Sequence, residues 1–255
     1  MALSGRVLAQ LPTPGAADQK QILADATDYA INHERGLPNF ICTQTTRRFQ
    51  DFNFRDEWRP IDIIVERLAY FEHHEDYKVI EINGVPSSQD HDKLGGASSS
   101  GEFGSVMKQI FAPATAATFN WQTWFTLRKH KMHVYAYQVA LAKSDYHVMV
   151  PEQHKDLVTA YHGLIFIDDE AHFVHRITLH ADGIPPAFPI QDISLMLGYE
   201  YTRIGNSDYL LPLTFELRSR DGNVRIRNDV DYDQYRKFTS ESSLTYTAPA
   251  DPAKK

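Results

Sequence analysis

Residues 157–238 constrain the fold more than any other part of this 255-residue chain. They contain five runs of strand length, rich in aliphatic and aromatic side chains, and short polar or glycine-containing segments separate most neighbouring runs. Strands joined by such short turns pair antiparallel with their neighbours, so this stretch predicts a five-stranded meander. The five runs are residues 158–167, 173–181, 195–204, 210–219 and 224–235.

The residues before this meander continue the same pattern. Ile22, Ala26 and Ala30 fall on one face of a predicted helix over residues 16–35, and a second, shorter helix is predicted over residues 102–111. The absence of an alternating strand–helix rhythm favours a mainly β (α+β) fold, with about ten strands in one large, curved antiparallel sheet or half-barrel and a few covering helices. Further strands are predicted over residues 39–49, 58–71, 76–82, 118–128, 132–141 and 146–150.

Domain organisation follows from composition. Residues 16–247 form a single predicted domain, residues 1–15 a flexible N-terminal segment and residues 248–255 a disordered tail rich in proline, alanine and lysine. Residues 1–12 are too short to contain a complete signal peptide.

Two pairs of residues predict tight turns. Asn83-Gly84 and Asp221-Gly222 each lie between two strand-like runs, and these residue types tolerate positive φ angles, so each pair is predicted to close an antiparallel hairpin. Residues 86–101, by contrast, are rich in serine and glycine and predict a mobile loop. His91, flanked by Asp90 and Asp92, is the best local candidate for acid–base chemistry on that loop, although a solvated connector is the favoured interpretation.

Charge and cysteine content exclude several classes of function. The formal net charge of −7 gives no electrostatic support for a nucleic-acid partner. No apolar run approaches the roughly 20 residues that span a bilayer. Cys42 is the one cysteine, so intramolecular disulfides and multi-cysteine metal sites are excluded, and its place in a strand is typical of a small buried residue. The sequence does not indicate an oligomeric state.

Twelve histidines prompt a search for metal and acid–base sites. His73 and His74 are consecutive in a strand and point to opposite faces, so they do not readily share an ion. His172 and His180 alternate to the same face as Arg176, but no HExxH, GxSxG, GxGxxG or P-loop pattern is present. No catalytic residue, metal site or cofactor is therefore predicted, and the protein is predicted not to be an enzyme.

Aromatic residues are the candidate ligand-binding positions. Phe119, Trp121 and Phe125 are predicted to share one face of a strand, and Phe166 and Phe215 lie on other strands. Large side chains on the concave face of a curved sheet line a ligand cavity if that face is open. They form an ordinary core if helices fill the face.

Five segments carry a resemblance to known families: residues 161–168 (YHGLIFID), 175–178 (HRIT), 199–201 (YEY), 209–212 (YLLP) and 37–42 (LPNFIC). Together they resemble a set of uncharacterised bacterial exported proteins over most of the chain. The order of a strand with an Asp turn, a strand with Arg-Ile, a tyrosine strand and a Leu-Pro strand also resembles the LolA/LolB-like lipoprotein-carrier superfamily, over about the C-terminal two thirds. The second resemblance implies an incomplete antiparallel barrel capped by helices, a hydrophobic cavity that holds acyl chains, and a periplasmic or otherwise exported location.

Three functions are compatible with these features. The leading hypothesis is a non-enzymatic envelope protein that binds an apolar or lipid-like ligand, or an acylated protein, in the concavity of the sheet. A cavity lined by Trp121 and Phe125 would favour it. Solid packing there would favour a structural or interaction protein, and convergence of His91 with another histidine or a carboxylate would favour a hydrolase.

Overall fold

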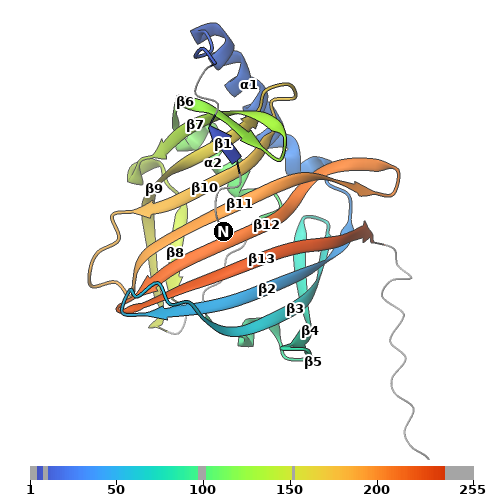
Figure 1. Ribbon diagram of the computed structural model, residues 1–255, viewed down its shortest axis with the longest axis vertical. Coiled ribbons are helices and arrows are strands. Elements are labelled where there is room, and N and C mark those ends of the chain that lie inside the picture. The colour runs from blue at the N-terminus through green and yellow to red at the C-terminus, as the bar shows by residue number, and fades with distance from the viewer. Residues whose placement is uncertain (1–4, 8–10, 97–101, 151–152, 239–255) are drawn as a thin grey trace, which may run out of the picture.

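The computed structural model describes residues 5–7, 11–96, 102–150 and 153–238 (Figure 1). Within these residues, thirteen strands form one sheet in which every pair is antiparallel, in the order β1-β6-β7-β9-β10-β11-β12-β13-β2-β3-β4-β5, with β8 paired to β9 beside β7. The sheet curves but does not close, because β1 and β5 are its two ends. The strands are β1 (Gly5–Val7), β2 (Phe40–Phe52), β3 (Arg59–Phe71), β4 (His74–Ile82), β5 (Val85–Pro86), β6 (Thr118–Leu127), β7 (His130–Val139), β8 (Tyr146–Val150), β9 (Lys155–Asp168), β10 (Val174–Asp182), β11 (Ile190–Ile204), β12 (Ser207–Asp221) and β13 (Val224–Lys237).

The five-stranded meander is confirmed, since β9 to β13 lie side by side in chain order. Both predicted tight turns also close antiparallel hairpins: Asn83 and Gly84, at φ 53° and 79°, join β4 to β5. The second turn is centred one residue later than predicted, because Asp221 pairs with Val224 around Gly222. The strands β1 and β5, of three and two residues, are the elements that the sequence pattern did not predict.

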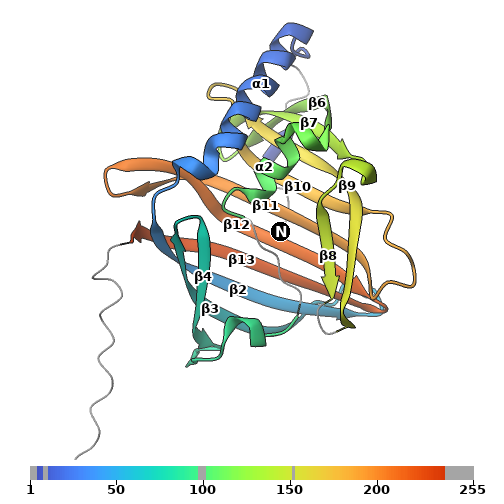
Figure 2. The same ribbon diagram turned by 180° about the vertical axis from the view of Figure 1, so that it is seen from behind.

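Two helices cover one face of the sheet, which we call the helix-covered face (Figure 2). Helix α1 (Ala16–Asn32) buries Ile22, Ala26 and Ala30, the stripe predicted from the sequence, and small alanines allow close approach to the core. Helix α2 (Ser105–Phe111) buries four of its seven side chains. Short 3₁₀ turns follow both helices, η1 (His33–Gly36) after α1 and η3 (Pro113–Thr115) after α2. Two more follow strands, η2 (His91–Lys93) after β5 and η4 (Leu141–Lys143) after β7.

The main hydrophobic core lies between these helices and the sheet. Alternate strand residues point into it, such as Tyr135 and Tyr137 of β7 and Ile165 of β9. The residues between them point to the opposite side, which we call the open face. There Phe125, Leu127, Met132, Val134 and Phe166 form a second, smaller apolar cluster. Among the described residues, no helix combines the length and apolar character needed to cross a bilayer.

Candidate functional site

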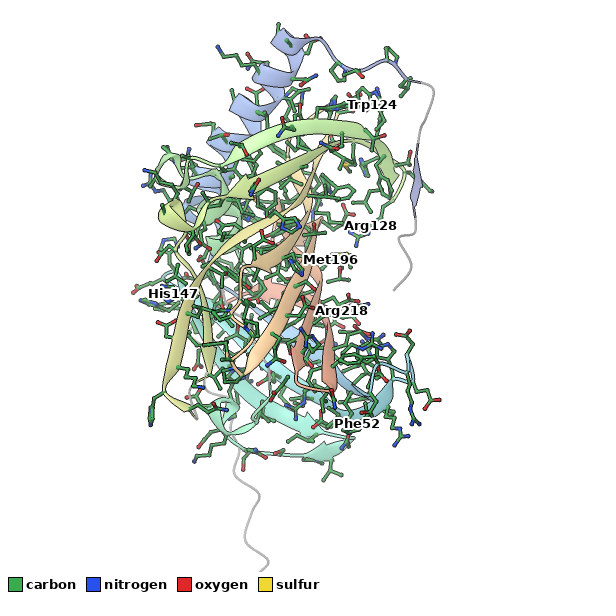
Figure 3. The ribbon with its side chains drawn as sticks, turned by 90° about the vertical axis from the view of Figure 1, so that its left-hand side faces the viewer. Phe52, Trp124, Arg128, His147, Met196 and Arg218 are labelled. Atoms are coloured by element: carbon green, nitrogen blue, oxygen red, sulfur yellow. The ribbon has the colours of Figure 1, made fainter. Side chains whose placement is uncertain are left out.

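The open face contains a depression of about 960 Å³ that spans β6, β7, β9, β10, β11 and β12. Its volume falls in the range of about 300–1,000 Å³ that is usual for ligand sites. Half-buried apolar side chains form the floor: Ala136, Ala160, Leu164 and Met196. Figure 3 shows Met196, Arg128 and Arg218 on one side of the molecule, whereas His147 lies on the opposite side.

Arg128 anchors the tip of the β6–β7 hairpin above this face. Its Nη1 donates to the backbone oxygen of Tyr199 at 3.3 Å and forms an ion pair with Glu200 Oε2 at 3.2 Å. The residue opposite Tyr199 in the ladder is Pro212, which has no N–H to offer. The Arg128 guanidinium therefore provides a hydrogen-bond donor to a carbonyl whose ladder partner lacks one, and it holds the hairpin over the face.

A break in the β9–β10 ladder shapes the centre of the depression. Tyr137 reaches across β9 and donates its hydroxyl hydrogen to Thr178 O at 2.8 Å. The Thr178 hydroxyl then accepts from Leu164 N at 2.9 Å, in place of a backbone carbonyl. Gly163 lies at this point because a Cβ there would stand 1.9 Å from Thr178 O. Only glycine permits this approach of the two strands.

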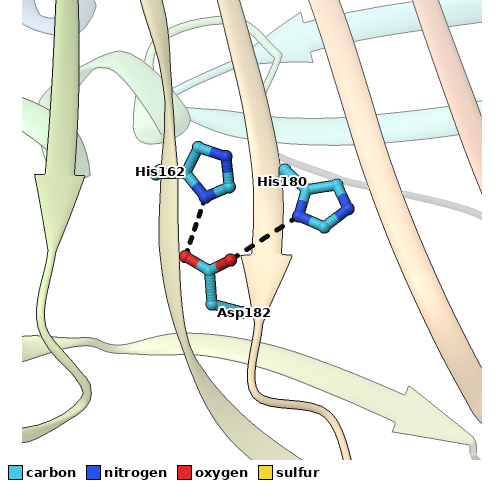
Figure 4. Close-up of side chains that lie close together, drawn as sticks. All are labelled: His162, His180 and Asp182. Atoms are coloured by element: carbon cyan, nitrogen blue, oxygen red, sulfur yellow. Dashed lines mark hydrogen bonds and ion pairs between the residues drawn. The ribbon is translucent and has the colours of Figure 1, made fainter.

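Charged side chains surround the floor. His162 Nδ1 lies 2.8 Å from Asp182 Oδ2, and His180 Nδ1 lies 3.7 Å from Asp182 Oδ1 (Figure 4). On its other side His180 Nε2 lies 2.8 Å from Asp192 Oδ1. Arg218 Nε donates to Glu216 Oε1 at 2.7 Å on the β12 side. The depression thus has an apolar floor and a rim that contains both acidic and basic side chains.

The five predicted ligand-binding aromatics do not form one cluster, and none of them lines this depression. Phe119, Trp121 and Phe215 pack against the main core on the helix-covered face, whereas Phe125 and Phe166 belong to the second cluster on the open face, with ring centroids 5.3 Å apart. The expectation that Trp121 and Phe125 share a face is wrong. A β-bulge between Trp121 and Thr123 shifts the β6–β7 register and reverses the alternation.

His91 does meet a carboxylate. Its Nδ1 lies 2.7 Å from Oε1 of Glu66, a residue that is 2% exposed, and its ring stacks on Tyr77 with centroids 4.5 Å apart. The other Glu66 oxygen accepts from Gln44 Nε2 at 3.1 Å. Arg48 donates to Gly95 O at 2.6 Å and so holds a second point of the same loop. The described part of the predicted loop, up to residue 96, is therefore anchored to the sheet, and residues 97–101 lie outside the described residues.

The side chains of the helix-covered face are poorly suited to nucleophilic chemistry. Burial raises the pKa of the Cys42 thiol far above its usual value, and Cys42 is 3% exposed. Burial also raises the pKa of Tyr135 and of Tyr161 to about 12. These groups stay protonated near neutral pH, in keeping with a packing role.

Comparison with known proteins gives no family by sequence: no family model and no curated protein matches the chain. Solved structures do match. A LolA superfamily protein of Nitrosomonas europaea has a TM-score of 0.43 at 7% identity, with 89% of this chain and 97% of that chain covered. A putative outer membrane lipoprotein-sorting protein domain of Vibrio parahaemolyticus has a TM-score of 0.39 at 9% identity, with 87% of this chain and 94% of that chain covered. The Mycobacterium tuberculosis lipoprotein LppX has a TM-score of 0.30 at 8% identity, with 87% of this chain and 98% of that chain covered. At these levels of similarity, function has to be inferred from the residues of this chain.

Proposed function

We propose that this protein is a non-enzymatic binding protein for a lipid-like ligand, held in the depression on the open face. The supporting observation is a concavity of about 960 Å³ with an apolar floor and a charged rim. An amphiphile matches both parts, because its chain removes Leu164 and Met196 from water while its polar end stays at the rim. Each buried methylene of such a chain contributes about 0.8 kcal/mol.

The cellular setting is part of the same proposal. The resemblance of the sequence to LolA/LolB-like carriers implies an exported protein of the cell envelope, and a lipid or an acylated protein as the ligand. Binding of an acyl chain of about ten methylenes would offset the entropy of association and give micromolar affinity.

A fluorescent fatty-acid probe tests the proposal on the full chain. Met196→Asp places a charge in the floor and is expected to weaken probe binding at least tenfold. Met149→Asp is the matched control, because Met149 lies on β8 at 62% exposure and does not line the depression. Circular dichroism of both variants checks that they are folded.

The outcome also separates the other hypotheses. Loss of binding in a folded Trp121→Asp variant, with Met196→Asp unaffected, would place the ligand among the aromatics of the helix-covered face. In that case it would have to displace part of the packing around α2. No binding by the folded wild-type chain would refute the proposal and leave a structural or interaction protein.

A hydrolase is the second candidate, because His91 and the buried Glu66 form the His–carboxylate pair on which that hypothesis depends. The same pair is explained by attachment of the loop to β3. Among the described residues, no serine, threonine or cysteine side chain hydrogen-bonds His91. Hydrolysis of a chromogenic acyl ester that disappears in His91→Gln would support the hydrolase, whereas equal rates in the two proteins would leave His91 as an anchor.

A further inference from the structure

We propose that His162, His180 and Asp182 bind a divalent transition-metal ion of the zinc type at the rim of the open-face depression. The three side chains come from neighbouring strands, His162 from β9 and the other two from β10 (Figure 4). One ligand atom from each lies within 4.8 Å of the other two. This inference does not depend on the lipid-like ligand.

Strand pairing brings the three side chains together on one face of the sheet. His162 is the direct cross-strand partner of His180, and Asp182 follows two residues along the same strand and so points to the same face. All three side chains are partly exposed, so small χ rotations suffice to contract the cluster. Bonds of about 2.0–2.1 Å to a tetrahedral ion require ligand atoms about 3.3 Å apart.

The hydrogen bonds of His180 leave one ring nitrogen ready for a metal. His180 Nε2 lies 2.8 Å from Asp192 Oδ1, and the carboxylate can only accept, so Nε2 is the donor. In the neutral ring the proton is therefore on Nε2, and Nδ1 carries the lone pair. Nδ1 is shielded from solvent and has no hydrogen-bond partner among the described residues. A carboxylate that holds the second nitrogen of a metal-binding histidine is the usual outer partner of such ligands.

His162 supplies the second nitrogen. Its Nδ1 shares a hydrogen with Asp182 Oδ2 at 2.8 Å, and an ion that enters there replaces this proton and gains the carboxylate as a third ligand. Two imidazoles and one carboxylate favour Zn²⁺, Co²⁺, Ni²⁺ or Cu²⁺ over Mg²⁺ and Ca²⁺, which prefer oxygen donors. Three protein ligands leave a coordination position for water or another donor, and it opens toward the depression.

The test is titration of the chelator-treated full chain with ZnCl₂, followed by calorimetry and by competition with a chromophoric chelator. The expected result is one tight site per chain that is lost in His180→Gln and in Asp182→Asn. Asp192→Asn, which removes only the outer partner, is expected to weaken binding by about 10–100-fold. Co²⁺ at the site is expected to show the intense visible bands of low-coordinate cobalt.

His147→Gln is the matched control. His147 also lies near two carboxylates, with Asp156 at 2.8 Å and Asp145 at 3.4 Å, but it belongs to β8 and lies at the opposite side of the molecule (Figure 3). The His147→Gln substitution is expected to leave the zinc affinity unchanged. Zinc affinity that is equal in wild type, His180→Gln and Asp182→Asn would overturn the proposal, as would loss of binding in His147→Gln alone. Thermal unfolding of each variant confirms that a loss of binding occurs in folded protein.

Discussion

Replacing Gly163 with alanine is expected to destabilise the protein more than the same change at Gly198 or Gly36. The new Cβ would stand 1.9 Å from Thr178 O, 2.7 Å from Thr178 C and 3.0 Å from Tyr137 Cε1. Two of these three atoms are backbone, so no side-chain rotation removes the collision. The strands β9 and β10 have to separate locally.

The expected cost follows from three contributions. Overpacking of a well-packed site costs about 1–3 kcal/mol. Separation of the strands also breaks two hydrogen bonds, from Tyr137 to Thr178 O and from Leu164 N to the Thr178 hydroxyl, each of about 1 kcal/mol. The reduced entropy of the unfolded chain returns about 0.4–1 kcal/mol. We therefore expect the free energy of unfolding to fall by about 2–5 kcal/mol, a large share of the 5–15 kcal/mol typical of a domain.

Urea unfolding followed by tryptophan fluorescence measures the change, and two further glycines provide a graded control. At Gly198 the nearest atom to a new Cβ is Thr214 Oγ1 at 2.8 Å, a side-chain atom that can rotate away, so a smaller loss is expected. At Gly36 nothing lies within 4 Å, and the change is expected to be within about 0.5 kcal/mol. Equal stability of the Gly163 and Gly36 variants would refute the close approach of the two strands.

Three further expectations concern buried groups. Burial lowers the pKa of His33 from 6.5 to about 4, so the unfolded chain binds a proton at a higher pH than the folded chain does. The free energy of unfolding should therefore fall by up to about 3 kcal/mol as the pH is lowered from 6.5 to 4. Urea titrations of His33→Phe should show a weaker dependence on pH. Cys42 should react with a thiol reagent at pH 8 only after unfolding, and rapid reaction of the native protein would contradict its burial. Glu66→Ala should cost about 1–3 kcal/mol by removing the closer hydrogen-bond acceptor of Gln44, and should speed proteolysis near His91; an unchanged cleavage pattern would count against the anchor.

Most of the sheet could be predicted because regular strands carry a local signal. Alternation and turn chemistry located the meander, and β8 (Tyr146–Val150) begins and ends where it was predicted. Helix α1 was found from the spacing of Ile22, Ala26 and Ala30. The strand β1 was not predicted because three residues are too few to show alternation. Its partner β6 also lies more than a hundred residues away in the sequence.

The candidate site could not be predicted because single-residue irregularities assemble it. The bulge after Trp121 separates the aromatics that alternation had placed together. A second irregularity, between Val174 and Arg176, shifts the β9–β10 register by one residue. Without this irregularity, the register that pairs Ile167 with Val174 would pair His162 with Leu179. His180 and His162 would then point to opposite faces of the sheet. The sequence shows both histidines, but the pairing that unites them depends on this bulge.

The irregularities also explain why the two faces of one sheet differ. Where the ladders are regular, alternate apolar residues meet the helices and the core is filled, as around Tyr135 and Ile165. Where a ladder is interrupted, polar groups replace backbone partners: Arg128 bonds a carbonyl opposite Pro212, and the Thr178 hydroxyl takes the place of a ladder carbonyl. Thr178 lines the depression, and Arg128 lies on the same side of the molecule (Figure 3). Because such interruptions reduce ladder pairing, side-chain groups take over the pairing of backbone atoms at both positions.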